Sequence, residues 1–563
     1  MTEAASLKMT GGEAIVRALK AFGVRHVFGL PGNQLRFYDA LARDGSIEHV
    51  LVRHEQAAAH MADGYARITA RVGVCEGSAG PGSTNLVTGL AEAFASGIPI
   101  VALATTTRSH LSGRANFQEL DLENVFRPIT KRVLRLDRAA RVPEIVKRAF
   151  RIAASGKPGP VVIVAPADLH VESVAIDASA FEVSTDEGQW PALRAAPAER
   201  DVDRVVELLA NSERPLIWAG GGVLASGAMA ELEAVATSLA IPVATTYMGK
   251  GAIAETHPLC IGPVGQIGRP ATNEFVKRAD LVLAVGTRFT NLDTATWSLP
   301  ARGTRLVHVD IDPEEIGRHF EVELGIWSDA RTFLAVLAKR SRPLARAQRP
   351  WADEAGAVAE RWRREQGPMS RRPLEAVQGT VHPLQVIAAL QRAMRPADVI
   401  ICDSGFNQVW GGQYFETMQS GRRYIGPRGM GVMGYSFPAA IGARLGDASR
   451  RYIALCGDGG FMMMIHEIET SLRINAPVVV CVMNNRNLEY CTQIQRAFGG
   501  VAKSTTMLDT DFAAVARAMG GNGVRITAAA DLEPALRTAL DSNRTTVIDV
   551  VTPDSALPDG LSL

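Results

Sequence analysis

Short apolar runs alternate with longer segments of mixed polarity along most of this chain. In the last third, the run from Arg451 to Cys456 is strand-like, and the segment from Phe461 to Arg473 is long enough for one helix. Pro477 to Met483 is a second apolar run, rich in β-branched residues. The pattern predicts a strand, a helix and a strand. Because a helical crossover joins parallel strands, we expect both strands to end at the same edge of one sheet.

Two polar stretches, rich in proline and charge, divide this alternation into three blocks. They cover about 179–201 and 340–382, and neither has sustained strand patterning. Both are predicted to be linkers, the second partly helical. The blocks predict an α/β protein with three doubly wound parallel-sheet domains, at residues 1–178, 200–342 and 380–563.

Composition limits the possible partners. Of the 563 residues, 47% are apolar and 21% are charged, as in ordinary globular proteins, and the net charge of +1 gives no reason to expect a nucleic acid or an anionic membrane. The start MTEAASLKMT does not resemble a signal peptide, and apolar stretches such as 98–104 are far too short to span a bilayer. Six scattered cysteines predict reduced thiols in a cytoplasmic protein.

The first candidate site lies at the ends of the two predicted C-terminal strands. Asp458 follows one strand in a Gly-Asp-Gly turn, and the pair Asn484-Asn485 ends the next. The carboxyl ends of parallel strands are where open α/β sheets bind ligands. A carboxylate, an amide oxygen and a glycine-lined loop suit a hard cation such as Mg²⁺ that also carries a diphosphate. A tight turn and a simple strand end remain the alternative.

The N-terminal block carries the second candidate site. In RHEQAAAHMADGYAR, a strand delivers Glu55 to the start of an alanine-rich helix, where an acid can also be only a favourable helix charge. Further on, Gly80-Pro81-Gly82 and Asn85 stand at a strand-to-helix turn, and GRANFQELD carries Gln118. A Gly-Pro turn and a polar helix cap are the structural alternatives there.

A third pattern is Gly429, Gly431 and Gly434, spaced G-x-G-x-x-G. Alone, this spacing is weak evidence for a nicotinamide dinucleotide site. Such a site needs a strand directly before the glycines and an acid on a second strand. The nearest comparable acid is Asp458, which belongs to the metal candidate. A nicotinamide oxidoreductase is therefore the least favoured function.

Together, these segments resemble the thiamine-diphosphate-dependent enzymes, and most closely the acetolactate synthase-like members, from about Met9 to Pro553. The resemblance implies that Mg²⁺ is held by Asp458, Asn485 and a backbone oxygen of Asn487. It also implies that Glu55 shares a proton with the aminopyrimidine ring, whose imino form then removes the thiazolium C2 proton. The site residues implied to contact the cofactor besides these are Pro81, Asn85, Gln118, Gly405, Phe406, Asn407, Gly431, Met433, Gly459, Gly460, Leu488, Glu489 and Tyr490.

The same resemblance gives some of these residues specific roles. Met433 corresponds to the bulky apolar residue that wedges between the two cofactor rings. The middle block corresponds to a domain that binds FAD in acetolactate synthases. Gly220-Gly221-Gly222 and Arg288 keep that pattern, but Thr290-Asn291 replace the usual acidic pair and argue against FAD, which stays an open alternative.

Several departures concern the substrate. Asn33-Gln34 replace the small Gly-Ala of the family's first loop, and Tyr490 and Ile494 replace a Met and a Trp. Asn33 and Gln34 are therefore expected to add bulk and hydrogen-bonding groups near the reacting carbon. His110 is a candidate for substrate contact or proton relay, and a hydrogen-bonded loop histidine is the alternative.

The resemblance implies an enzyme of the transferase or lyase type. A 2-oxo acid would be decarboxylated, and the resulting enamine would attack an acceptor carbonyl, as in acetolactate synthase. Non-oxidative decarboxylation or a specialised carboligation of a larger 2-oxo acid is the alternative. The family also implies a homodimer or homotetramer with active sites at chain interfaces.

Overall fold

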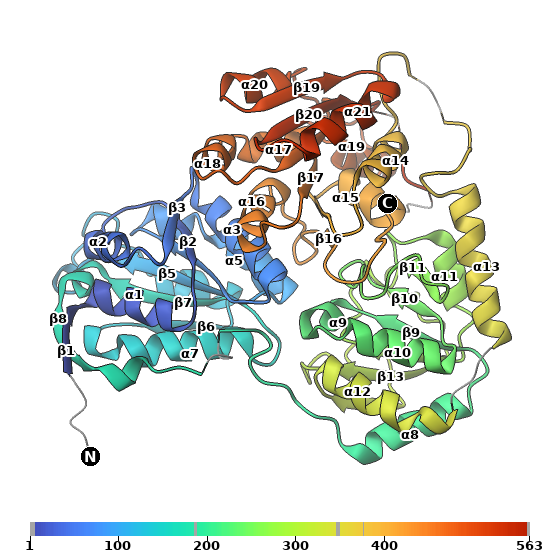
Figure 1. The fold of residues 1–563 in the computed structure, drawn as a ribbon, viewed down its shortest axis with the longest axis horizontal. Coiled ribbons are helices and arrows are strands. Elements are labelled where there is room, and N and C mark those ends of the chain that lie inside the picture. Colours follow the sequence, from blue (N-terminus) through green and yellow to red (C-terminus); the bar gives the residue numbers. More distant parts are fainter. Residues whose placement is uncertain (1–5, 185–187, 345–348, 375–376, 555, 560–563) are drawn as a thin grey trace. The chain divides into compact units, whose positions relative to one another are not determined.

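Three parallel sheets form the core of the protein. The computed structural model describes residues 6–184, 188–344, 349–374, 377–554 and 556–559 (Figure 1). Within these residues, three six-stranded sheets are parallel throughout, and one two-stranded sheet is antiparallel. The predicted architecture of three α/β parallel-sheet domains is confirmed.

The first sheet has the order β3-β2-β4-β5-β7-β6. Its central strands are mostly apolar and almost wholly buried, as expected when helices cover both faces of a parallel sheet. The strands are β2 (His26–Gly29), β3 (Glu48–Leu51), β4 (Gly73–Gly77), β5 (Ile100–Thr106), β6 (Arg132–Arg135) and β7 (Val161–Pro166). The helices are α1 (Gly11–Ala21), α2 (Leu35–Asp44), α3 (Glu55–Thr69), α4 (Pro81–Thr84), α5 (Val87–Ser96), α6 (Leu122–Phe126) and α7 (Val142–Ala154).

The second sheet has the order β11-β10-β9-β12-β13-β14. Counted along the chain, this is 3-2-1-4-5-6, the order of dinucleotide-binding folds. The strands are β9 (Pro215–Ala219), β10 (Val243–Thr245), β11 (Cys260–Pro263), β12 (Leu281–Val285), β13 (Arg305–Asp310) and β14 (Leu324–Trp327). The helices are α8 (Glu199–Ala210), α9 (Gly221–Ser226), α10 (Met229–Leu239), α11 (Pro270–Val276), α12 (Ala330–Arg340) and α13 (Pro350–Glu365).

The third sheet has the order β16-β15-β17-β18-β20-β19. The strands are β15 (Val399–Cys402), β16 (Tyr424–Ile425), β17 (Tyr452–Gly457), β18 (Val479–Asn484), β19 (Asn522–Ile526) and β20 (Thr546–Val551). The helices are α14 (Pro383–Ala393), α15 (Phe406–Tyr414), α16 (Ser436–Gly446), α17 (Asp458–Met464), α18 (Glu467–Arg473), α19 (Glu489–Ala497), α20 (Phe512–Ala518) and α21 (Ala529–Leu540).

By its internal contacts the chain divides into two compact units, which do not follow the sequence order. The first unit comprises 1–193, 427–449 and 464–477, and the second comprises 194–426, 450–463 and 478–563. Helix α16 therefore packs in the first unit, beside α3 (Figure 1). Gly442 allows this approach, because a Cβ there would lie 2.0 Å from the carbonyl oxygen of Met61.

Two local features differ from the sequence expectation. The helix expected from Phe461 to Arg473 is two helices, α17 and α18, separated by Ile465 and His466. No glycine or proline marks the break, so the residue pattern could not place it. The pair of β1 (Ser6–Thr10) with β8 (Ser173–Asp177) is an addition, because two strands so distant in sequence give no joint signal.

The two polar stretches contain no named strand within their described residues. Helix α13 lies in the second of them, as the prediction of a partly helical linker requires; residues 185–187, 345–348 and 375–376 lie outside the described residues. Across the part of the chain that the structure covers, no helix is both long and apolar enough to cross a membrane.

Candidate active site

Glu55 is the first residue of α3 and is only 5% exposed. The side chain of His54 caps this helix by accepting a hydrogen bond from the backbone N–H of Gln56. The buried carboxylate of Glu467 accepts hydrogen bonds from the backbone N–H groups of Arg53 (2.9 Å) and His54 (3.2 Å). The backbone that leads into Glu55 is thus held on both sides, which orients its carboxylate.

The two oxygens of the Glu55 carboxylate have different surroundings. Asn85 Nδ2 donates a hydrogen bond to Glu55 Oε2 over 2.9 Å. On the other side, a Cβ at Gly82 would lie 3.1 Å from Glu55 Oε1, so the glycine leaves room there. An amide donor on one oxygen and little steric cover on the other suit a carboxyl group that exchanges a proton with a ligand.

Pro81 and Gln118 lie in the same region of the first unit. Gly80 precedes Pro81 with a φ of 66°, and Gln118 has a φ of 64°, which is unusual for a residue with a side chain. The two loops touch, because a Cβ at Gly80 would lie 2.9 Å from the Cβ of Gln118. The carboxyl edge of the first sheet therefore brings together Glu55, Pro81, Asn85 and Gln118.

The glycine-rich segment before α16 is anchored in the first unit. The buried carboxylate of Glu92, on α5, accepts hydrogen bonds from the backbone N–H groups of Gly429 and Met430, both over 2.8 Å. Gly431 has a φ of 71°, and Met433 is half-buried. The ten residues between β16 and α16 form a long loop rather than a direct strand-to-helix turn, so the geometry of a dinucleotide fingerprint is not met.

Asp458 begins α17 in the second unit and is 4% exposed. Its Oδ1 accepts a hydrogen bond from the backbone N–H of Gly459 (2.7 Å), and its Oδ2 accepts one from that of Arg486 (2.6 Å). Burial raises the pKa of Asp458 to about 6, against the opposing effect of the backbone N–H groups. A buried carboxylate whose charge is disfavoured by burial gains strongly from a bound cation.

The two asparagines of the pair have different positions. Asn484 points into the protein, where its Nδ2 donates to Asp549 Oδ1 (2.9 Å). Asn485 is half-buried, and its Oδ1 accepts a hydrogen bond from the backbone N–H of Asn487 (3.2 Å). Arg486, which lies between Asn485 and Asn487, has a φ of 58°, a strained backbone conformation of the kind found at binding sites. The second asparagine is thus the one at the edge beside Asp458.

The expected ligand set fits a hard divalent cation. The backbones of Asn485 and Asn487 lie near the carboxylate of Asp458, and the side-chain oxygen of Asn485 contacts the Asn487 N–H. The backbone hydrogen bonds of the bridge between Asn487 and Thr506 use Leu488 N–H and the Arg486 carbonyl, not the Asn487 carbonyl. The described residues hold no cluster of three His, Cys, Asp or Glu. A set with one carboxylate and neutral oxygens is typical of Mg²⁺ that also binds phosphate oxygens.

The loop after β15 adjoins this edge. Gly405 has a φ of 100° and precedes α15, and Asn407 Nδ2 donates to the Asp403 carbonyl oxygen over 2.8 Å. A Cβ at Gly460 would lie 3.1 Å from Asp403 Oδ1, so the loops after β15 and β17 meet. The ring of Phe406 contacts that of Tyr490 edge-on, with centroids 5.3 Å apart. The segments after β15, β17 and β18 therefore lie close together in this part of the second unit.

The segment after Asn487 completes that edge. Leu488 is half-buried and precedes α19, and its N–H is used by the Thr505 carbonyl, so it is no phosphate donor in this conformation. Glu489 is buried and accepts a hydrogen bond from Asn487 Nδ2 over 2.6 Å. Glu489 therefore stabilises the loop that contains Asn487, and this role accounts for its buried position.

Two predicted substrate residues lie differently from expectation. Gln34 is 2% exposed and points into the first sheet, where its amide is fully engaged, so it is not available to a substrate in the way expected. His110 lies on the surface, with its side chain 64% exposed and its Nδ1 4.0 Å from Asp168 Oδ2. This contact fits the loop-histidine alternative. Asn33 is exposed, as a substrate contact requires.

Three buried acids near these groups escaped the sequence analysis: Glu76, Glu92 and Glu467. Each acid lies in a run of mostly buried residues. An acid inside a mostly apolar run was the only sequence signal that could have identified it. Their importance comes from partners distant in the chain, which a single sequence does not identify.

The second sheet has the strand order of a nucleotide-binding fold, and its glycines allow tight approach of two strand ends. A Cβ at Gly222 would lie 2.6 Å from the Cα of Gly286. At the place of the family's acidic pair, the Thr290 hydroxyl donates to Asp293 Oδ2 over 2.7 Å. This turn is closed by its own side chains.

Comparison with known proteins agrees with this arrangement. The family models of the thiamine pyrophosphate enzymes match residues 9–125 (N-terminal TPP binding domain), 202–337 (central domain) and 403–550 (C-terminal TPP binding domain). The central match contains the whole second sheet, and the other two matches cover most strands of the first and third sheets.

The relatives cover almost the whole chain. A probable acetolactate synthase large subunit of Methanocaldococcus jannaschii is 37% identical over 98% of this chain and 93% of its own. The acetolactate synthase large subunit of Corynebacterium glutamicum is 34% identical, over 98% and 88%. Acetolactate synthase isozyme 3 large subunit of Escherichia coli is 33% identical, over 96% and 94%. Together with Glu55 and Asp458 at their sheet edges, these matches show that the chain belongs to the thiamine pyrophosphate enzymes and is similar to acetolactate synthase large subunits.

Proposed function

We propose that this enzyme decarboxylates a 2-oxo acid and joins the remaining fragment to an acceptor carbonyl, with thiamine diphosphate and Mg²⁺ as cofactors. The observation that carries the proposal is the buried Glu55, with Asn85 Nδ2 2.9 Å from its Oε2 and the Gly82 backbone beside its Oε1. When bound, thiamine diphosphate supplies the carbon nucleophile and stores the electron pair that carbon dioxide leaves behind.

The chain's own part in the chemistry begins at Glu55. Its carboxyl group would hold or give up one proton at Oε1, while Asn85 keeps Oε2 in place. Glu467 orients the backbone ahead of this residue. Burial of Glu55 excludes water, which strengthens the hydrogen bond that moves the proton.

The second unit would hold the charged end of the cofactor. Asp458, Asn485 and the Asn487 carbonyl are the proposed ligands of Mg²⁺. Gly405, Phe406 and Gly460 would supply backbone groups for the diphosphate, whereas the Gly459 N–H already donates to Asp458 Oδ1. The raised pKa of Asp458 supports a cation next to it, because the cation offsets the cost of the buried charge. Neither proton transfer at Glu55 nor cation binding at Asp458 requires FAD. The turn at Thr290, which its hydrogen bond to Asp293 closes, argues against an FAD site.

The proposed donor is pyruvate and the proposed product an acetolactate-type acid. The printed names of the relatives support this choice. The second candidate is decarboxylation or specialised carboligation of a larger 2-oxo acid, and the exposed Asn33 in the first loop favours it. A nicotinamide oxidoreductase has no support from the loop between β16 and α16.

The assembly and location belong to the same proposal. We infer a homodimer or homotetramer, in which the Glu55 region of one copy and the Asp458 region of another act on one cofactor. A cytoplasmic location is supported by the six free cysteines, five of them buried and Cys491 exposed.

The test is carbon dioxide release from a panel of 2-oxo acids, with thiamine diphosphate and Mg²⁺ added or withheld, followed by mass analysis of the products. Cofactor-dependent conversion of pyruvate to a five-carbon hydroxy-oxo acid would support the first candidate. Release only from a larger 2-oxo acid would support the second. No release from any acid would contradict both.

A further inference from the structure

Glu76 is an acid in the middle of an apolar sheet. It is the fourth of five residues in β4, a strand in the interior of the first sheet with every residue buried, and it is itself 0% exposed. Its neighbour across the sheet is Gly29 on β2. A Cβ at Gly29 would lie 2.2 Å from Glu76 Oε1, so the carboxylate occupies space that only a glycine leaves.

The carboxylate of Glu76 engages Gln34, at the end of the first loop. Gln34 Nε2 donates hydrogen bonds to Glu76 Oε2 and to the Gly77 carbonyl, both over 3.1 Å. Gln34 Oε1 accepts one from the Tyr38 hydroxyl over 2.9 Å, and that hydroxyl accepts one from the Gly32 N–H over 3.2 Å. Gln34 is thereby fixed at both ends of its amide, and the loop closes on itself through Tyr38.

Asn33, the residue before Gln34, is oriented outward and not into the sheet. It is exposed, and its Oδ1 accepts a long hydrogen bond, 3.4 Å, from the Ala79 N–H in the loop that leads to Gly80 and Pro81. Asn33 Nδ2 donates to no residue among those the structure describes. The first loop therefore offers one amide N–H₂ group at the sheet edge that also carries Glu55.

The surroundings of Glu76 are polar on several sides. His49 on β3 places its Nε2 3.1 Å from Glu76 Oε1 with its own side chain 15% exposed, and Tyr38 on α2 packs edge-on against His49. Burial raises the pKa of Glu76, the bond to His49 lowers it, and the charge of Glu55 on α3 raises it further. Glu76, Gln34 and His170 line one small internal cavity, and both ring nitrogens of His170 have no hydrogen-bond partner among the described residues.

A purely structural role does not account for this acid. An apolar side chain at position 76 would complete the buried strand without the several kcal/mol that desolvation of a carboxylate costs. Buried polar networks with all partners in place select one conformation of the segments they join. Here the joined segment is the first loop, where the chain also departs from its family by Asn33-Gln34.

We propose that Glu76 is a positioning residue that determines substrate specificity by locking Gln34 inward, so that Asn33 alone presents its amide to the 2-oxo acid. The accepted acid then carries an acceptor oxygen on its side chain, which Asn33 Nδ2 binds. This inference rests on the second candidate of the proposed function, a larger 2-oxo acid, because the methyl group of pyruvate carries no oxygen that Asn33 Nδ2 could bind. Glu76 itself touches neither the substrate nor the cofactor and acts through Gln34.

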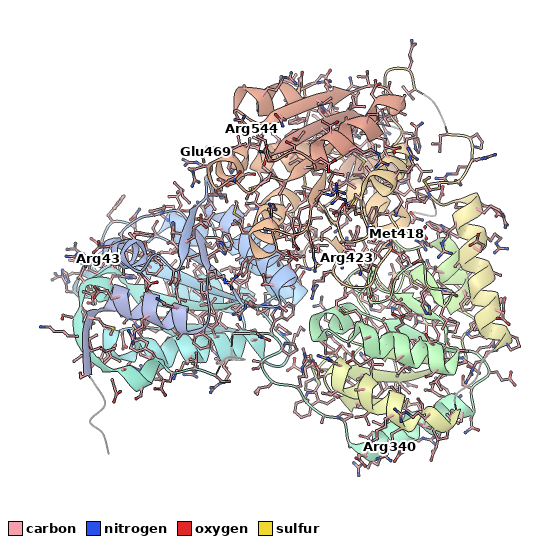
Figure 2. All side chains as sticks on the ribbon, viewed as in Figure 1. Arg43, Arg340, Met418, Arg423, Glu469 and Arg544 are labelled. Carbon is pink, nitrogen blue, oxygen red and sulfur yellow. The ribbon has the colours of Figure 1, made fainter. Side chains whose placement is uncertain are left out.

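The test compares Glu76→Gln with Arg43→Gln. Arg43 lies on the outer face of α2, at the surface of the first unit (Figure 2), where its side chain is 65% exposed and pairs with Asp39. Glu76→Gln keeps the shape but loses the charge-assisted bond to Gln34. We expect KM for the preferred polar 2-oxo acid to rise about tenfold against an apolar one of similar size, with kcat and thiamine diphosphate affinity little changed. Arg43→Gln should match the wild type.

Hydrogen exchange of the cofactor-free protein gives a readout that needs no turnover. The amides of Gly32 to Arg36 should exchange about tenfold faster in Glu76→Gln, because a bond that closes the loop is weakened, and should not change in Arg43→Gln. In a Gln34→Met background, Glu76→Gln should add nothing further, since it acts through Gln34. That comparison remains informative if one variant is poorly stable.

The outcomes separate the two proposals. If the wild type releases no carbon dioxide from any 2-oxo acid, the proposed function and the specificity role both fail. If the wild type accepts pyruvate but no 2-oxo acid with an oxygen on its side chain, the specificity role alone fails. If the wild type is active and Glu76→Gln keeps its substrate preference and its loop exchange, the role of Glu76 alone is overturned. Equal effects of Glu76→Gln with and without Gln34→Met would also overturn it.

Discussion

The first and third sheets have the same strand order but different loops. Numbered along their own part of the chain, both run 2-1-3-4-6-5. After the third strand, one has Gly80-Pro81-Gly82 and the other has Asp458-Gly459-Gly460. After the fourth strand, each has two non-glycine residues with a positive φ, among them Gln118 in one and Arg486 in the other. The shared order puts loops at equivalent edges, and the residues in those loops decide which chemistry the edge performs.

The two sheet edges differ most in the groups that surround their acidic residue. In the first sheet, Glu55 has an amide partner and an open side next to a glycine. In the third, Asp458 has both oxygens in contact with backbone N–H groups. The first arrangement suits a proton exchanged with an organic ring, and the second suits a fixed carboxylate that binds a cation. Each prediction below changes one side of this contrast.

Glu55→Gln is expected to have the largest effect. It removes the exchangeable proton but keeps an oxygen for Asn85, so turnover should fall about 1000-fold while cofactor affinity stays within a few-fold. Steady-state carbon dioxide release and a fluorescence titration with thiamine diphosphate would measure the two quantities. Glu144→Gln, an exposed acid in the first turn of α7, is the control and should change neither. Normal turnover of Glu55→Gln would remove the proposed difference between the two edges.

Asp458→Ala should act on binding rather than on proton transfer. Mg²⁺-dependent affinity for thiamine diphosphate is expected to fall by at least roughly 100-fold, because even loss of a group that only orients a metal ligand costs about 10- to 100-fold. Calorimetry at several Mg²⁺ concentrations would test this. Asp541→Ala removes an exposed carboxylate, 68% exposed, from the same unit and should bind normally. Unchanged affinity of Asp458→Ala would refute the metal assignment.

Replacing Asn33-Gln34 by Gly-Ala should change substrate preference by about tenfold, with little effect on cofactor binding. The two residues belong to the loop after the first strand, where the third sheet has Asp403 to Gly405 instead. Competition between pairs of 2-oxo acids, read as a ratio of products, is the measurement. An unchanged ratio would mean that the loop does not face the substrate.

Mild acid should weaken the first sheet before the third. His26, His60 and His170 in the first unit have pKa values lowered by burial from 6.5 to about 4. Because the folded protein then disfavours protonation, the stability they contribute is complete above pH 6.5 and is lost as the pH falls toward 4. At pH 6 the loss is about 1 kcal/mol for each histidine.

Hydrogen exchange at pH 7 and pH 6, corrected for intrinsic rates, would show this as faster opening of β2 and α3. The control is β17 and β18, which contain no histidine and should keep their protection. Equal loss of protection in both sheets would show that the buried histidines do not set the acid sensitivity of the first unit.

Much of the architecture was predictable because it rests on local patterns. Alternating apolar runs and amphipathic segments predicted three parallel sheets, and strand ends predicted where Glu55, Asp458 and Asn485 would emerge. The break between α17 and α18 was not predictable, since no helix-breaking residue marks it. The direction of Gln34 was not either, because a polar residue in a loop gives no sign of pointing inward.

The sequence by itself determined the fold class, the family and the two acids at the sheet edges, because residue periodicity and short motifs are local properties. The tertiary structure alone decided which residues those acids depend on. Glu467 holds the backbone before Glu55, Glu92 holds the loop before Met433, and Glu76 holds Gln34. Each contact joins positions far apart in the chain, and only the packing of strands and helices brings such positions within hydrogen-bonding distance.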